Sequence, residues 1–473
     1  MNNNSEEQPI SNDNSENNNN NIDGLKKLED NLSILKELYK SFQNLNIDDI
    51  NLNDVINDFH SENKETKFRA LVCLRKIITK FDESTNKKII DLQILQEIIG
   101  YLDNSNNEFI HEALWCLTNL SMGKEDQSMN IILYGGLNKI MPLMDSKIEE
   151  IKIQSIWVFS NMVCGSNKIR DIFIEKGIYD KLINFASDEN NENILEKTFW
   201  AISNFFRSNK NPSYDILDKA FKISGKRIVE INTTNIEILL NVLYIFECFC
   251  KYFPDNLKEF VEINLIQKIR DLLENSEPRI IRKCLNIIKY FSEGKDDDTQ
   301  IIIDYNILEK FKKTLFYQEE FSNETCWIIS NIACGTKGQK ETLIQQGFFE
   351  LLKKSFYKNN YKKPPLFAIC NFITTINDND ENLTKFTSEG VIKILFEGLK
   401  IEENECLKIT LEAVALILKY GKKMSPTIKN PFAILFKKLG IIDILEKLKL
   451  YENEGVKNDS NFIMNEYFND KIK

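Results

Sequence analysis

The side chains that could perform chemistry are few in this sequence, and histidine is the scarcest of them. His60 and His111 are the only histidines, so metal clusters and catalytic triads built on histidine are nearly excluded. Ten cysteines are scattered along apolar stretches, which indicates small buried side chains in a reducing compartment rather than a metal site. The sequence therefore predicts no catalytic residues, no metal and no cofactor, and the protein is not expected to be an enzyme.

Two short segments resemble ligand-binding loops and are better interpreted as turns. Gly335-Thr-Lys-Gly-Gln-Lys340 lacks the glycine and lysine order of a phosphate loop and has no strand before it. A partial calcium-loop spacing is formed by Asp378, Asp380, Asn382 and Glu389. Leu383 stands where such a loop needs glycine for its sharp turn. We expect an inter-repeat turn and a solvated turn.

Tryptophan and asparagine recur four residues apart, which places both side chains on one helix face. The pairs are Trp115/Asn119, Trp157/Asn161, Trp200/Asn204 and Trp327/Asn331. An asparagine amide can hold the N–H and C=O of one residue of an extended peptide. Indole rings accept aliphatic stems and attract ammonium or guanidinium groups. A ladder of such pairs suits an extended Lys/Arg-rich segment.

The alternative interpretation is structural, with each Trp in the core and each Asn capping a helix end. A packing role needs only size and apolarity, so Leu or Phe would often serve as well as Trp. Counting Asn371, the amide recurs in one register in five repeats, which packing alone explains poorly. The recurrence favours a binding surface.

The elements that must position this ladder follow from its period. Successive tryptophans are 42, 43 and 127 residues apart, and the last step is close to three periods. Degenerate repeats are expected with Leu243 to Glu247 and Asn286 to Tyr290 at the Trp and Asn positions, and Phe367 to Asn371 follows Trp327 by 40. Glycines such as Gly347 and Gly440 separate apolar helical runs. This pattern predicts an all-α, right-handed superhelical solenoid of about ten armadillo repeats, each a helical hairpin.

Charge and composition divide the chain into three parts. Residues 1–46 are predicted to be an acidic, Asn-rich, largely disordered segment with a short helix between 25 and 45. Residues 47–468 form the solenoid, and 469–473 a short tail. The net charge is −10, of which the first 60 residues carry −8, so binding to nucleic acid is not expected. The sequence offers no apolar run of membrane-spanning length.

Several segments resemble the importin alpha family of armadillo-repeat adapters, which carry proteins with basic nuclear localisation signals. The resemblance covers about residues 53–468. Besides the four Trp-Asn helices, it rests on Phe68-Arg-Ala, Ser203-Asn-Phe-Phe-Arg-Ser-Asn-Lys-Asn-Pro212 and Thr410-Leu-Glu-Ala-Val-Ala. It implies an adapter that moves between cytoplasm and nucleus and binds the basic signals of its cargo.

The resemblance also implies where a ligand binds. A major site matches Trp115, Asn119, Gln154, Trp157, Asn161, Trp200 and Asn204. A minor site matches Glu324, Trp327, Asn331, Phe367 and Asn371, with Phe367 replacing the family's second tryptophan.

This sequence departs from the family at several groove positions. Gly165 stands where the family usually places an Asp that meets a buried lysine, and Lys197 where a neutral amide is expected. Leu240 and Pro364 replace polar or acidic groove residues. We therefore expect grip on a peptide backbone with weakened lysine selectivity.

The family also implies importin beta as a partner, bound through an Arg/Lys-rich amino-terminal segment. Residues 1–60 contain no Arg, and Lys26-Lys27 is their only adjacent basic pair. The competing hypothesis for the whole protein is an armadillo scaffold that binds another extended partner and has no part in nuclear transport.

Overall fold

The computed structural model describes residues 50–80, 83–91, 93–207, 211–230, 233–375, 386–425 and 429–468. The predicted amino-terminal segment with its short helix, the tail, and Asp378, Asp380 and Asn382 of the partial calcium loop lie outside the described residues. The predicted domain boundaries therefore stay predictions.

The described residues form helices and turns without any strand, and the chain divides into two compact units. Unit 1 ends at Lys181 and unit 2 begins at Leu182, within helix α11 (Ile178–Asp188). The helices of unit 1 before α11 are α2 (Leu52–Phe59), α3 (Lys64–Ile78), α4 (Glu83–Asp91), α5 (Ile94–Gly100), α6 (Asn107–Leu120), α7 (Glu125–Leu133), α8 (Gly136–Leu143), α9 (Glu149–Val163) and α10 (Asn167–Glu175). Those of unit 2 are α12 (Glu192–Asn204), α13 (Tyr214–Glu230), α14 (Ile236–Tyr252), α15 (Glu259–Glu262), α16 (Leu265–Leu272), α17 (Pro278–Glu293), α18 (Asp296–Asp304), α19 (Ile307–Tyr317), α20 (Glu319–Cys334), α21 (Lys337–Gln345), α22 (Phe348–Lys358), α23 (Lys363–Thr374), α25 (Glu389–Gly398), α26 (Asn404–Met424), α27 (Pro431–Leu439), α28 (Ile441–Leu448) and α29 (Glu454–Ile463).

Each repeat ends in one helix that carries the ladder position, which we name the closing helix. The described residues contain ten closing helices, in agreement with the predicted number of repeats: α3, α6, α9, α12, α14, α17, α20, α23, α26 and α29. Most closing helices follow two shorter helices, as α20 follows α18 and α19, so these repeats are triplets rather than the predicted hairpins. The all-α armadillo-repeat prediction is confirmed.

Asparagine fixes the start of several closing helices. The side chain of Asn106 accepts hydrogen bonds from the backbone N–H groups of Glu108 (2.8 Å) and Phe109 (3.4 Å). Asn191 and Asn235 cap α12 and α14 in the same way. These bonds satisfy N–H groups that have no partner inside the helix, so the sequence itself sets where the ladder helix begins.

The turn before the second helix of a triplet requires a left-handed residue. Gly347 has φ +80° at the amino end of α22, where glycine adopts this conformation without steric cost. Asn264 and Asn306 take the same place before α16 and α19, with φ of 56° and 54°. Asparagine tolerates this conformation, so the repeats without the glycine marker keep the same turn.

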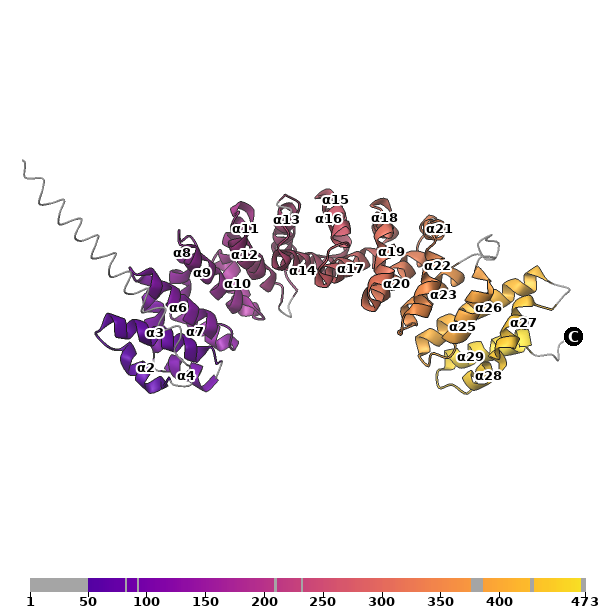
Figure 1. The fold of residues 1–473 in the computed structure, drawn as a ribbon, viewed down its shortest axis with the longest axis horizontal. Coiled ribbons are helices and arrows are strands. Elements are labelled where there is room, and N and C mark those ends of the chain that lie inside the picture. Colours follow the sequence, from indigo (N-terminus) through magenta and orange to yellow (C-terminus); the bar gives the residue numbers. More distant parts are fainter. Residues whose placement is uncertain are drawn as a thin grey trace, which may run out of the picture. The chain divides into compact units, whose positions relative to one another are not determined.

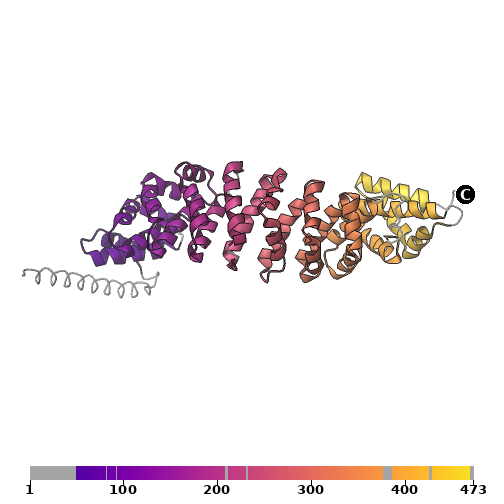
Figure 2. The same cartoon turned by 90° about the horizontal axis from the view of Figure 1, so that it is seen from above.

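Successive closing helices pack side by side within each unit, as Figures 1 and 2 show for α14, α17, α20 and α23. Aromatic side chains fill part of the core of unit 2, where the rings of Phe221 and Phe249 stack with centroids 4.0 Å apart. Phe221 is fully buried. None of the described helices is long and apolar enough to cross a membrane.

Candidate functional site

Four tryptophans occupy the same position on four closing helices. Each lies nine positions after the residue that caps its helix: Asn106 to Trp115, Ile148 to Trp157, Asn191 to Trp200, and Gln318 to Trp327. All four rings are half-buried, so each keeps part of its surface in solvent. Equivalent positions place each Trp-Asn pair on the same face of its helix. Two of these pairs belong to unit 1 and two to unit 2.

In unit 1 a buried ion pair supports the first tryptophan. Arg75 Nε lies 2.6 Å from Glu112 Oε2, and the two side chains are only 6% and 0% exposed. The guanidinium carbon of Arg75 lies 4.1 Å from the centroid of the Trp115 ring. A cation of the chain therefore already occupies one contact that a ligand arginine would make with this ring. Sequence reasoning missed this contact because Arg75 and Glu112 lie 37 residues apart.

The ladder amides of unit 1 brace neighbouring closing helices. Asn119 Nδ2 donates to the carbonyl oxygen of Arg75 (3.4 Å), and Asn161 Nδ2 donates to that of Thr118 (3.0 Å). Gln154 is buried, and its Nε2 donates to Thr118 Oγ1 at 2.6 Å. An asparagine Nδ2 carries two hydrogens, so a brace still leaves one hydrogen and the oxygen for a ligand. Asn161 is half-exposed, whereas Asn119 and Gln154 are buried and serve packing first.

His111 packs against the first tryptophan. Its ring lies 5.7 Å from that of Trp115 in an edge-on arrangement. Burial lowers the pKa of His111 below its ordinary 6.5; Arg75 also lowers this pKa, while Glu112 and Glu150 oppose the shift.

We expect unit 1 to lose stability as the pH falls below this ordinary value. Below pH 6.5 His111 is protonated in the unfolded chain but still neutral in the folded chain. The free energy of unfolding therefore decreases as the pH falls from 6.5 to the pKa of folded His111. Urea unfolding of a Trp157→Phe/Trp200→Phe/Trp327→Phe chain, in which Trp115 is the one remaining tryptophan, measures the decrease by fluorescence between about pH 7.5 and 5.5. His111→Gln should flatten the profile, and His60→Gln, at the other histidine of the chain, is the control. An unchanged slope in His111→Gln would contradict the assignment.

In unit 2 the predicted minor-site residues come together. The Trp327 and Phe367 rings lie 5.2 Å apart and are inclined by 56°. Asn331 Nδ2 donates to Ser292 Oγ (3.1 Å), and Asn371 Nδ2 donates to Ser330 Oγ (2.9 Å), which repeats the bracing of unit 1.

A carboxylate accompanies the two rings of this site. Glu324 lies three residues before Trp327, and its Oε2 is buried without a hydrogen-bond partner, 3.8 Å from Lys289 Nζ. Among the described residues, no lysine or arginine lies over the Trp327 ring. An aromatic ring and a carboxylate with an oxygen that accepts no hydrogen bond both attract a ligand lysine.

Trp200 has a cation of the chain beside it. Lys197 Nζ lies 6.0 Å from the centroid of the Trp200 ring and 2.9 Å from Glu196 Oε1. Lys363 makes a similar contact with Phe367: its Nζ lies 5.8 Å from the centroid of the Phe367 ring and forms an ion pair with Glu403. Asn204 is buried. Lys197, which stands where the resemblance would place a neutral amide, therefore interacts with the Trp200 ring.

The structure corrects the predicted register of one degenerate repeat. Leu243 was placed at the Trp position, but it is fully buried, whereas Tyr244 is half-exposed nine residues after the cap Asn235. Tyr244 therefore replaces tryptophan in α14, and Cys248, not Glu247, stands at the Asn position. Counting from the capping asparagine, rather than by the average period, would have found the correct register.

Gly165, where the resemblance would place an aspartate, lies in a left-handed turn. Gly165 follows the end of α9 with φ +80°, a left-handed conformation that glycine adopts at no steric cost and aspartate at some cost. Ser166, the next residue, caps α10 by accepting from the N–H of Ile169. Pro364 is buried in the first turn of α23, so it offers no polar group to a ligand there.

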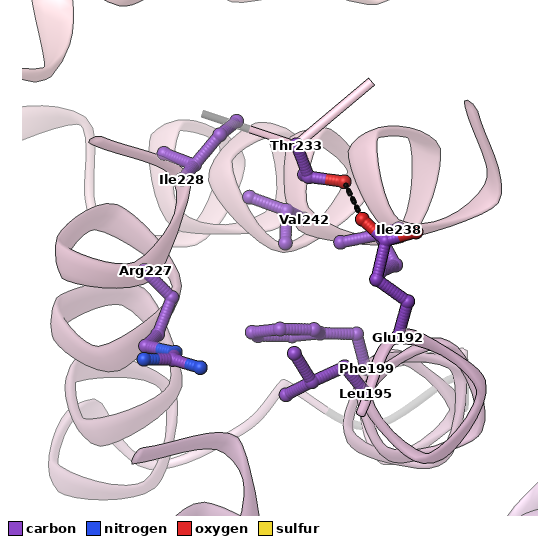
Figure 3. Close-up of a pocket in the computed structure, with 8 residues that line it drawn as sticks. All are labelled: Glu192, Leu195, Phe199, Arg227, Ile228, Thr233, Ile238 and Val242. Atoms are coloured by element: carbon purple, nitrogen blue, oxygen red, sulfur yellow. Dashed lines mark hydrogen bonds between the residues drawn. The ribbon is translucent and has the colours of Figure 1, made fainter. Parts of the chain in front are cut away.

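The predicted turn near Gly335 is a helix start, in which Thr336 and Gln339 cap α21 reciprocally. No described group of His, Cys, Asp or Glu could hold a metal ion. Figure 3 shows the lining of a small cavity, with Thr233 hydrogen-bonded to Glu192 on one side and Arg227 on the other. The volume of this cavity is about 10 Å³. Such a volume holds about one water molecule at most.

Comparison with known proteins finds importin alpha subunits. Importin subunit alpha-1a of Oryza sativa subsp. japonica is 22% identical over 296 residues, which cover 62% of this chain and 56% of the rice protein. The match therefore spans just over half of that relative. Importin subunit alpha-3 of Arabidopsis thaliana is 22% identical over 413 residues, covering 86% of this chain and 77% of the relative.

Comparison of structures supports the fold. The crystal structure of an engineered protein aligns with a TM-score of 0.70 and 17% identity, covering 89% of this chain and 98% of that one. A likeness at this identity shows the fold alone. No model of a protein family matches the sequence.

Proposed function

This chain is an importin alpha-like armadillo-repeat protein, and we propose from its ladder that it is a nuclear import adapter. It binds the basic nuclear localisation signal of a cargo protein in an extended conformation and works in the cytoplasm and nucleus without catalysis. The observation that carries the proposal is the repeated placement of a half-exposed tryptophan nine residues into four closing helices.

The ladder offers the two interactions that a lysine-rich strand needs. Trp157 in unit 1 and Trp327 in unit 2 present indole surface to aliphatic stems and cationic heads. Asn161 and Asn331 are half-exposed beside them and can bond to a peptide backbone. Glu324 adds a carboxylate for one lysine. These residues support binding of a basic peptide in either unit.

Cationic side chains of the protein itself limit the affinity that we expect for a basic peptide. Arg75 and Lys197 already lie beside Trp115 and Trp200, so a ligand cation gains less at these two rings than at Trp327. We therefore expect micromolar rather than nanomolar affinity for a short basic peptide, corresponding to roughly 8 kcal/mol.

A titration of the full chain with a labelled lysine-rich localisation peptide tests the proposal. The expected result is saturable binding with a Kd of about 1–10 μM at about 50 mM salt, weakened several-fold at about 300 mM. A peptide of equal length with glutamine in place of each Lys and Arg should not bind. Absence of saturable binding of the basic peptide at low salt would overturn the proposed function.

A further inference from the structure

A pocket of about 440 Å³ opens beside Trp200 in unit 2, and four of its nine lining residues are cationic. It is lined by Trp200, Arg207, Glu237, Leu240, Asn241, Tyr244, Arg279, Arg282 and Lys283. These residues come from α12 and the turn after it, from α14 and from α17. Four cationic side chains face one carboxylate, in a protein whose net charge is −10. The lining itself is therefore cationic, and three carboxylates that pair with it, those of Glu247, Glu277 and Glu320, lie outside the lining.

Tyr244 holds two of these cations at one ring. The guanidinium carbon of Arg207 lies 4.6 Å, and Nζ of Lys283 5.1 Å, from the centroid of the Tyr244 ring. The Tyr244 hydroxyl donates to the carbonyl oxygen of Phe206 at 3.4 Å, which fixes the ring. No carboxylate of a described residue pairs with Arg207, so its guanidinium relies on the ring and on solvent. Lys283 also pairs with Glu247.

The two arginines of α17 form ion pairs that a ligand can displace. Arg282 lies 2.6 Å from Glu320, with side-chain exposures of 48% and 52%. Arg279 lies 3.0 Å from Glu277 and 3.4 Å from Glu237, and it is 54% exposed. Exposed pairs of this kind contribute little net free energy, so rearranging them costs little.

We propose that this pocket binds a phosphate group on a phosphorylated serine or threonine of the extended peptide. The inference rests on the proposed function, because it places the phosphate on a ligand that follows the ladder past Trp200. A doubly charged phosphate has three acceptor oxygens, and planar guanidinium groups bind such oxygens in pairs. A ligand lysine is repelled by the same lining, so the pocket selects the opposite charge to that bound at Trp327.

Three peptides that differ at one residue test the pocket with the full chain. Each carries the same lysine-rich segment followed by serine, glutamate or phosphoserine at one position, and anisotropy gives each Kd. We expect the phosphoserine peptide to bind about tenfold more tightly than the serine peptide, with glutamate between them. The Arg279→Ala/Arg282→Ala variant should reduce this preference to less than threefold. Equal affinities of the serine and phosphoserine peptides for the unaltered chain would overturn the proposal.

A matched control removes the same charge elsewhere in unit 2. Lys258→Ala/Lys295→Ala also deletes two exposed, ion-paired cations, and it should keep the full preference for phosphoserine. Equal losses in both double variants would show general electrostatics and contradict a specific pocket.

A lysine-free phosphoserine peptide separates this inference from the proposed function. If it binds in an Arg279- and Arg282-dependent way while no lysine-rich peptide binds, the pocket stands and the adapter role fails. If the lysine-rich serine peptide binds and phosphorylation adds nothing, the adapter role stands and the pocket inference fails. Stronger competition by a short single-stranded RNA than by the phosphopeptide would assign the pocket to nucleic acid and overturn the peptide proposal.

Discussion

Replacing Trp157 and Trp200 together with alanine is expected to abolish binding of a lysine-rich peptide, with a loss of affinity of at least about 100-fold. One ring comes from each unit, so each unit loses a ladder position. Each half-exposed indole contributes apolar contact to a lysine stem, and cation–π attraction to the lysine head is smaller at Trp200 because Lys197 lies beside that ring; together these amount to about 1–2 kcal/mol for each ring. Fluorescence anisotropy of a labelled peptide measures the loss directly.

The control must remove exposed aromatic surface away from the ladder. Tyr317 and Tyr357 are 55% and 58% exposed and belong to α19 and α22, which are not closing helices. The Tyr317→Ala/Tyr357→Ala variant should bind the peptide as the unaltered chain does. Far-ultraviolet circular dichroism should show unchanged helicity in both variants. If the Trp157→Ala/Trp200→Ala variant kept its affinity, the tryptophans would serve packing and the proposed peptide-binding site would be wrong.

The fold was predictable because its determinants are local and repeated. Asn106 and Asn191 start closing helices through hydrogen bonds to backbone two or three residues away, and Gly347 provides a left-handed turn. Each of these signals lies within a few residues and recurs with the period of the repeat. A repeat array amplifies weak local signals, since every repeat must use the same solution.

The parts of the site that sequence reasoning missed depend on contacts between repeats. Arg75 reaches Glu112 across 37 residues, and Lys283 meets Tyr244 across a neighbouring repeat. The predicted register of α14 was wrong by one residue. Tyr244 follows Trp200 by 44 residues, whereas Leu243, at 43 residues, fits the average period. On a helix one residue rotates the side chain by about 100°, which exchanges a core position for an exposed one. A cationic pocket assembled from three helices cannot be deduced from net charge.

The largest expected effect on stability is at the buried ion pair of unit 1. Glu112→Gln removes the Glu112 carboxylate from the guanidinium of Arg75 at a place where both side chains are almost fully enclosed. Removing one partner of such a pair typically costs about 3–5 kcal/mol. Arg75→Gln should cost a similar amount, since it leaves the fully buried Glu112 carboxylate unpaired. Hydrogen exchange of the amides in α3 and α6, followed by mass spectrometry, measures the loss locally, which suits an array that does not unfold in a single step.

The double variant Arg75→Gln/Glu112→Gln separates the pair from its surroundings. Two amides can hydrogen-bond to each other without a buried charge, so the double variant should be about 2–3 kcal/mol more stable than the sum of the single losses predicts. Arg69 and Asp58 provide the matched control, because they form an exposed pair in the same unit and Arg69 also lies on α3. Arg69→Gln should cost less than about 1 kcal/mol. Additive losses at Arg75 and Glu112 would show that the two side chains act independently, in which case Arg75 is held beside Trp115 by packing rather than by its carboxylate.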